Sequence, residues 1–318
     1  MQIISKSEIE RSIDITKIAP ALRAAFISMS RGDAQVPPVG YLGFPANNGD
    51  CHIKFGHIKG DPVFVVKIAT GFYSNPSKGL PTGNGVVLAL SAETGEVLAI
   101  LQDEGLLTDL RTGFGGAIAT EALARKDARK IAIVGTGVQA RHQIRAHREV
   151  LSKRNPVFTV WGRTPENARR LADELKGEGI TVDVSTELAE LCSESDVIVT
   201  STMSQSPIVM ADWIRPGTHI TATGADAPGK QELDTAVVKM ATVRIADHVA
   251  QCLHHGEFSH SGLLGTDVTE LGIILDGGVG GRTNDLEISV VDLTGVAVQD
   301  IAIAQTVLNS KSGNFNQQ

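Results

Sequence analysis

The chain has 318 residues, a formal net charge of −7 at pH 7 and only 4% aromatic residues. An acidic chain with few aromatic side chains lacks both the basic surface and the stacking platforms of a nucleic-acid-binding protein. No stretch approaches the roughly 20 apolar residues of a membrane helix, and the first residues do not resemble a signal peptide. The three cysteines, Cys51, Cys192 and Cys252, are widely spaced. Composition therefore predicts a cytoplasmic protein with reduced thiols, long enough for two domains.

The first third of the chain predicts a mixed α+β domain. Ser5 and Glu8 form a capping-box pattern that opens a short helix, and apolar spacing predicts a second helix over residues 16–30. Short strands bounded by Gly, Asn, Pro and Asp are then predicted at residues 51–55, 63–68, 85–90 and 96–101.

A helix over residues 107–124 and a charged connector at 125–130 separate this domain from a different pattern. From residue 130 onward strands alternate with helices, which is typical of a parallel, doubly wound sheet. The predicted strands cover residues 131–134, 157–161, 181–184, 196–200, 219–223 and 243–246. The fold class is therefore α/β, with a Rossmann-type domain at residues 125–298 and a smaller α+β domain at residues 1–124. An apolar helix near the C-terminus predicts that residues 299–318 return to the smaller domain.

A glycine-rich turn follows the first strand of the second domain. Gly135 allows the tight turn, Gly137 lets the backbone approach a pyrophosphate, and Ala140 keeps the following helix close to the sheet. The helix start offers free N–H groups to phosphate. The predicted cofactor-binding residues of this turn are Gly135, Thr136, Gly137, Val138, Gln139 and Ala140. A glycine turn without a ligand is the alternative.

The end of the second strand predicts which dinucleotide binds. An NAD site usually has Asp or Glu there, whereas this chain has Gly162, Arg163 and Thr164. A guanidinium binds a 2′-phosphate through a planar fork of donors. These three residues therefore favour NADP over NAD, unless Arg163 is only a solvated loop residue.

Charged residues elsewhere suggest a site for a small anion. Lys67 ends an apolar strand, Arg111 lies among apolar residues on a helix, and Asp226 follows a strand of the second domain. Each alone has a structural explanation as a salt-bridge partner, a surface residue or a helix cap. Together they provide two cations for a carboxylate and one acid to move a proton.

At these residues the chain resembles the ornithine cyclodeaminase/μ-crystallin family over nearly its whole length. The matching motifs are Lys67, Lys78-Gly-Leu-Pro-Thr82, Asp-Leu-Arg111-Thr112, Gly135-x-Gly137-x-Gln139-Ala140 and Gly224-x-Asp226-x-Pro-Gly-Lys230-x-Glu-Leu. The resemblance implies a homodimer in which the smaller domain carries the substrate and dimer contacts. It also implies an imino- or amino-acid substrate, with the α-carboxylate held by Lys67 and Arg111.

The resemblance assigns Asp226 as acid/base at the substrate nitrogen, and Lys67 is counted with it as catalytic. Further candidates for substrate contacts are Lys54, Thr82 and Lys230. Further candidates for cofactor contacts are Thr112, Thr202 and Thr294.

The chain also departs from the ornithine cyclodeaminases of this family. Those enzymes carry an acidic residue on the strand before Lys67, where this chain has Lys54, which would repel the second ammonium of ornithine. Lys54 could instead replace a family arginine that is missing near residues 40–45. These departures favour NADPH-dependent reduction of a 2-imino carboxylate, such as Δ1-pyrroline-2-carboxylate to L-proline. Ornithine cyclodeamination, alanine or amino-acid dehydrogenation, and non-enzymatic NADPH-dependent binding of a small molecule remain alternatives.

One more cluster could suggest a metal enzyme. Cys252, His254, His255, Glu257 and His260 lie close in sequence but lack a recognised ligand spacing, and adjacent histidines diverge on a helix. We therefore expect no metal, and no nucleic-acid or membrane partner.

Overall fold

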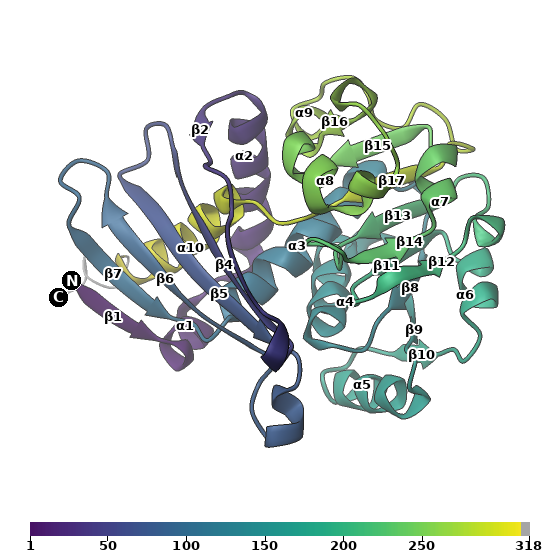
Figure 1. Cartoon of the computed structure of the whole chain (residues 1–318), viewed down its shortest axis with the longest axis horizontal. Helices are drawn as coiled ribbons and strands as arrows, with labels where there is room; N and C mark the ends of the chain where they lie inside the picture. The colour runs from purple at the N-terminus through teal and green to yellow at the C-terminus, as the bar shows by residue number, and fades with distance from the viewer. Residues whose placement is uncertain (313–318) are drawn as a thin grey trace. The chain divides into compact units, whose positions relative to one another are not determined.

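A computed structural model describes residues 1–312, which divide into two units (Figure 1). Unit 1 consists of Met1–Arg111 and the described residues from Val296 onward, and unit 2 is Thr112–Gly295. The division falls inside helix α3 (Leu106–Leu123) rather than at the expected residues 124/125. Gly113 and Gly116 explain the difference, because their missing side chains let α3 pack closely against His142 and Gln143 of unit 2. Residues 313–318 of the predicted returning segment lie outside the described residues.

Unit 1 is built on a seven-stranded sheet in the order β1-β7-β6-β5-β4-β2, with β3 also paired to β4. β1 is parallel to β7, and the other pairs are antiparallel. The strands are β1 (Gln2–Ser5), β2 (Ala34–Gln35), β3 (Gly40–Phe44), β4 (Gly49–Ile58), β5 (Val63–Phe72), β6 (Gly83–Ser91) and β7 (Val97–Gln102). The sequence predicted the last four but missed β1, β2 and β3.

Three helices complete unit 1: α1 (Lys6–Ser12), α2 (Ile18–Ser30) and α10 (Ala297–Ser312). The predicted capping box opens α1, where the Ser5 N–H donates to Glu8 Oε2 at 2.9 Å. α10, yellow in Figure 1, packs against α2, β4 and β5. The apolar C-terminal helix therefore returns to the first sheet, as predicted. It covers the sheet face on which Val65 and Lys67 are buried.

Unit 2 contains an eight-stranded sheet in the order β10-β9-β8-β11-β13-β17-β15-β16, in which every pair is parallel. Its strands are β8 (Lys130–Val134), β9 (Val157–Trp161), β10 (Val182–Val184), β11 (Val197–Thr200), β13 (His219–Ala222), β15 (Val243–Ala246), β16 (Thr269–Glu270) and β17 (Ser289–Asp292). A separate parallel pair is formed by β12 (Gln205–Val209) and β14 (Gln231–Leu233). The predicted Rossmann-type sheet is confirmed.

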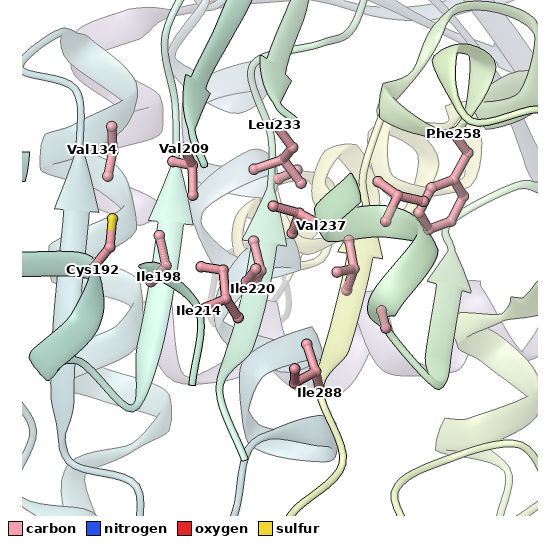
Figure 2. Packing of buried hydrophobic residues seen from close by; sticks show 14 of the residues in the cluster. Val134, Cys192, Ile198, Val209, Ile214, Ile220, Leu233, Val237, Phe258 and Ile288 are labelled. Carbon is pink, nitrogen blue, oxygen red and sulfur yellow. The ribbon is translucent and has the colours of Figure 1, made fainter. Parts of the chain in front are cut away.

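Helices connect most of these strands. They are α4 (Val138–Val150), α5 (Pro165–Gly177), α6 (Leu188–Glu194), α7 (Thr235–Met240), α8 (Val249–His255) and α9 (Leu271–Leu275). Figure 2 shows the apolar core on one side of the sheet, to which three strands contribute Val134, Ile198 and Ile220 and α7 contributes Val237.

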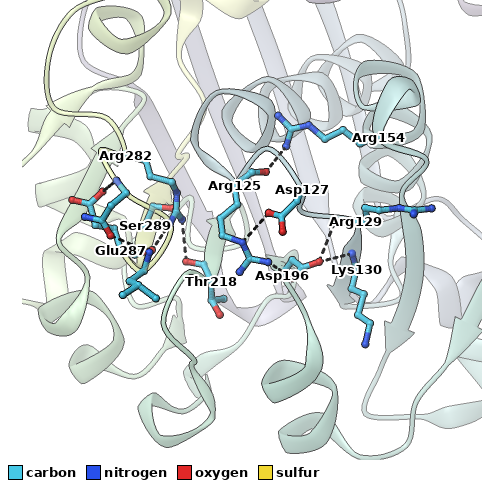
Figure 3. Close-up of polar contacts among 12 residues, drawn as sticks. Arg125, Asp127, Arg129, Lys130, Arg154, Asp196, Thr218, Arg282, Glu287 and Ser289 are labelled. Atoms are coloured by element: carbon cyan, nitrogen blue, oxygen red, sulfur yellow. Dashed lines mark hydrogen bonds and ion pairs between the residues drawn. The ribbon is translucent and has the colours of Figure 1, made fainter.

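Polar contacts hold the strand starts of unit 2, as Figure 3 shows. The Asp196 carboxylate accepts the backbone N–H of Arg129 and Lys130 at 2.9 and 3.0 Å, and lies 2.8 Å from Arg125 Nη2. Burial alone would raise the pKa of Asp196, but these contacts hold it below its ordinary value. The charged connector is thus tied to the start of β11.

Two structural findings concern membranes and metals. None of the helices in residues 1–312 combines the length and apolar character needed to span a bilayer. Within the same residues, His, Cys, Asp and Glu side chains form no group of three or more suited to a metal ion.

Candidate active site

The glycine-rich turn after β8 has a geometry that requires its glycines. Gly135 has a φ of 131°, and a Cβ there would lie 2.9 Å from the carbonyl oxygen and Oγ of Ser201. At the end of β9, a Cβ on Gly162 would clash with the Thr136 side chain. The predicted cofactor residues Gly135, Thr136 and Gly162 are therefore brought together.

The space beside this turn fits a dinucleotide phosphate. A Cβ on Gly137 would meet nothing within 4 Å, and Gly137 is the N-cap of α4. Ala140 is fully buried, which keeps α4 close to the sheet. Ser201 Oγ is buried beside Gly135 and has no hydrogen-bond partner among the described residues. Exposed backbone at a helix start and an unsatisfied hydroxyl are what a bound phosphate requires.

After β9, Gly162 is buried and the next two residues are open to solvent. Arg163 and Thr164 are exposed, and Thr164 is the N-cap of α5. An exposed guanidinium beside the glycine-rich turn has room to bind a phosphate on the adenosine ribose.

A buried carboxylate links the ends of the next strands. Glu232 accepts hydrogen bonds from Thr200 Oγ1 at 2.7 Å, the Thr202 N–H at 2.5 Å and the Gly224 N–H at 2.9 Å. Burial raises its pKa, and these hydrogen bonds oppose the rise. Glu232 thereby ties the predicted cofactor residue Thr202 to the segment that leads to Asp226.

Asp226 lies in the turn between β13 and β14 and is paired with another predicted residue. Lys230 Nζ is 2.6 Å from Asp226 Oδ1. The Asp226 side chain is 42% exposed, compared with 12% for Lys230. The carboxylate is therefore held by a cation and remains accessible.

The three other predicted threonines make local contacts. Thr294 Oγ1 donates to Asp247 Oδ1 at 3.1 Å and accepts from Gln251 Nε2 at 2.9 Å. The carbonyl of Thr112 accepts from Gln143 Nε2, and that of Thr82 accepts from the Phe72 N–H.

Unit 1 gathers the predicted cations on the sheet face covered by α10. Lys54 and Lys67 are directly opposite each other on β4 and β5, and Arg111 is on α3. All three are buried. Asp300 of α10 joins them: its Oδ1 is 2.9 Å from Lys67 Nζ and 3.0 Å from Arg111 Nε.

Burial and the neighbouring charges together set the pKa values of Lys67 and Asp300. Burial lowers the pKa of Lys67 to about 7, helped by Arg111 and Lys54, while Asp300 raises it. Burial would raise the pKa of Asp300, but Lys67, Arg111 and Lys54 hold it below its ordinary value. A buried cluster with more basic than acidic side chains is suited to bind an anion.

Sequence reasoning missed Asp300 and Ser201, and it treated Glu232 only as part of a motif. A signal for Asp300 was present, since it is an acid directly before the apolar run at residues 301–304 of α10, and acidic residues are rarely buried without a partner. No comparable signal marked Ser201.

Several known proteins are similar to this chain over nearly its whole length. The iminosuccinate reductase of Paracoccus denitrificans is 35% identical over 313 residues, covering 97% of this chain and 96% of that protein. An archaeal alanine dehydrogenase, solved as a dimer with bound NAD, superposes with a TM-score of 0.89 at 33% identity, covering 99% and 97% of the two chains. The Δ1-pyrroline-2-carboxylate reductase of Thermococcus litoralis, solved with NADH and L-proline, superposes with a TM-score of 0.91 at 28% identity. The match covers 99% of this chain and 98% of that chain.

The model of one family covers residues 1–314, which is almost the entire chain. The resemblance drawn from the sequence motifs is thereby confirmed. The chain belongs to the ornithine cyclodeaminase/mu-crystallin family.

Proposed function

We propose that this protein is an NADPH-dependent oxidoreductase that reduces the C=N bond of a 2-imino carboxylate, with a cyclic ketimine such as Δ1-pyrroline-2-carboxylate as substrate. The observation that carries the proposal is the buried cluster of Lys67 and Arg111, two cations suited to one carboxylate. The similarity to the reductase of T. litoralis supports a nicotinamide-dependent reaction of this class.

Lys67 and Arg111 would hold the substrate α-carboxylate. Charge-assisted hydrogen bonds from an ammonium and a guanidinium are strong, and they orient the planar imino acid for reaction at one carbon. When bound, the reduced nicotinamide supplies the hydride for that carbon.

Asp226 would hold the proton at the substrate nitrogen. A protonated iminium accepts a hydride more readily than a neutral imine. Lys230, 2.6 Å from Asp226, stabilises the carboxylate that exchanges this proton.

Several residues of unit 2 would hold the cofactor. Backbone groups of residues 135–140 suit the pyrophosphate, and Arg163 with Thr164 suits a 2′-phosphate. No acid stands at residues 162–164 to take the ribose hydroxyls of NAD. Thr112, Thr202 and Thr294 remain proposed as further contacts.

An imino dicarboxylate is a second candidate substrate. Lys54 adds a third basic side chain to the cluster, opposite Lys67, and would suit a second carboxylate. The similarity to the iminosuccinate reductase of P. denitrificans favours this alternative.

The deciding experiment follows NADPH oxidation with purified protein. The substrates are Δ1-pyrroline-2-carboxylate, its six-membered analogue, oxaloacetate with ammonia, and pyruvate with ammonia or methylamine. We expect the fastest oxidation with a cyclic imine, and slower oxidation with NADH. Ammonia release from ornithine with NAD, without imine reduction, would instead establish a cyclodeaminase. Cofactor binding without turnover in either assay would favour a binding protein.

A further inference from the structure

Asp300 is a buried carboxylate that contacts both cations assigned to the substrate. Its Oδ1 is 2.9 Å from Lys67 Nζ and 3.0 Å from Arg111 Nε, and its side chain is only 2% exposed. The neighbouring Gln299 accepts from Arg111 Nη1 at 3.0 Å and donates to the Arg111 carbonyl at 3.2 Å. Two successive residues of α10 thus fix the position of Arg111.

Stability alone explains this carboxylate poorly. Asp300 Oδ2 is buried and has no hydrogen-bond partner within residues 1–312. A buried oxygen that is left without a hydrogen bond destabilises the folded state. Apolar residues of the same volume often stabilise a core better than a buried ion pair does. The chemistry of the anion-binding cluster offers a better explanation.

Charged groups from four directions act on Lys67. Lys54 on β4 and Arg111 on α3 disfavour its protonated form, whereas Asp300 on α10 favours it. Asp103, a buried carboxylate just after β7, also interacts with Lys67. Of these groups, Asp300 makes the direct hydrogen bond to the ammonium.

We propose that Asp300 is a positioning residue: it keeps Lys67 protonated and orients Arg111, so that both can hold the substrate carboxylate, and it does not itself contact the substrate. This inference rests on the proposed binding of a 2-imino carboxylate by these two cations. Lys67 and Arg111 bind the substrate carboxylate, whereas Asp300 only sets their charge and orientation.

Asp300→Asn tests the inference, because it removes the charge and nearly preserves the volume. In the wild type, the KM for Δ1-pyrroline-2-carboxylate should rise above pH 7 as Lys67 loses its proton. In D300N this rise should begin at least about one pH unit lower, since a neighbouring opposite charge shifts a pKa by about 1–3. The KM at neutral pH should increase by about tenfold or more, with a smaller change in kcat and none in the Kd for NADPH. Asp300→Glu should partly restore the pH profile.

Asp50→Asn is the matched control, because Asp50 is a buried carboxylate on β4 that contacts Tyr73 and His52 instead. Its KM profile should match the wild type. An unshifted profile in D300N, or an equal shift in D50N, overturns the inference while the proposed function stands. If D300N does not fold, Lys67→Arg replaces it. The guanidinium remains charged, so the rise in KM above pH 7 should vanish, and its persistence overturns the inference.

Binding of pyrrole-2-carboxylate, a planar and unreactive carboxylate, separates this inference from the proposed reaction. If the wild type binds this probe but reduces no imine, the proposed function fails. Weaker binding by D300N would then still support the role of Asp300. If the wild type neither binds the probe nor reduces an imine, both proposals fail.

Discussion

Asp226 is accessible, paired with Lys230 and located at the carboxyl edge of the unit 2 strands. Asp226→Asn keeps the shape but cannot exchange a proton in the same way. We expect kcat for imine reduction to fall by about 100-fold or more, the usual range for loss of a general acid or base. NADPH binding, measured by fluorescence titration, should change little.

Asp234→Asn is a suitable control for this variant. Asp234 also follows a strand in unit 2, but it caps α7 by accepting from the Ala236 N–H. Its loss should leave kcat near the wild-type value. Full activity in D226N would remove Asp226 from the mechanism.

Arg163 decides the proposed preference for NADPH. Arg163→Ala should weaken NADPH binding by about tenfold or more while NADH binding stays within about twofold, because only NADPH carries the 2′-phosphate that the guanidinium would bind. Dissociation constants from calorimetry check this expectation. Arg169→Ala, an exposed arginine in α5, is the control. Equal weakening of both cofactors would mean that the 2′-phosphate is bound elsewhere.

The sequence predicted residue types better than it predicted their partners. Lys67 and Arg111 were recognisable because a cation in an apolar strand or helix needs a reason to be buried. Their shared partner was not recognisable, because Asp300 is almost 200 residues away from Arg111 along the chain and reaches it only through the return of α10. Contacts of this kind depend on tertiary packing, which local patterns do not encode.

At the scale of elements, a buried hydrogen-bonded chain joins α3, α4 and the unit 2 sheet. In order, it links Arg282, Ser289, His219, Thr221, Thr120, His147 and the Gln143 carbonyl, with successive distances of 2.8–3.0 Å. Arg282 can only donate and the final carbonyl can only accept. When both histidines are neutral, each group can therefore donate one hydrogen bond to the next group in this order.

Protonation of His147 would disrupt this chain. Burial lowers the pKa of His147 from 6.5 to about 4. Between these values the unfolded chain binds a proton that the folded protein does not. The free energy of unfolding therefore falls as pH drops through this window, by about 1.4 kcal/mol per pH unit for this group.

His147→Gln isolates this contribution, because glutamine can share hydrogen bonds but does not titrate. The variant should be less stable than the wild type at pH 6.5, and the difference should shrink by about 3 kcal/mol at pH 4. Urea unfolding at several pH values measures it. A difference that stays constant with pH would show that His147 has an ordinary pKa.

Strand length did not decide which strands were predicted. β9 and the four-residue β15 were predicted to the residue, whereas β17, also four residues long, was missed although it lies between β13 and β15. β17 comes after β15 and β16 in the sequence but lies between β13 and β15 in the sheet. The alternation of strands and helices along the chain therefore does not indicate it. β3 was missed because its glycines interrupt the strand pattern.

At the scale of the whole molecule, the sheet of unit 1 carries apolar side chains on the face opposite α10. One row across five strands is entirely apolar: Phe55, Val66, Leu88, Ile100 and Ile3. Phe55 and Ile3 are 39% and 57% exposed, and the other three are half-buried. An antiparallel sheet normally has a polar face toward water, and a continuous apolar face marks an association surface. We propose that a second copy of the chain covers this face.

Leu88→Glu tests this proposed homodimer. A carboxylate in the middle of the apolar row would be buried without a partner in the dimer, which costs several kcal/mol per copy. The wild type should elute with twice the mass of one chain in light scattering. L88E should be monomeric at the same concentration, with its dissociation constant raised by at least about 100-fold. Leu264→Glu, at a 68% exposed leucine of unit 2, should remain dimeric. A dimeric L88E would place the interface elsewhere, and dissociation of both variants would mean that added charge alone separates the subunits.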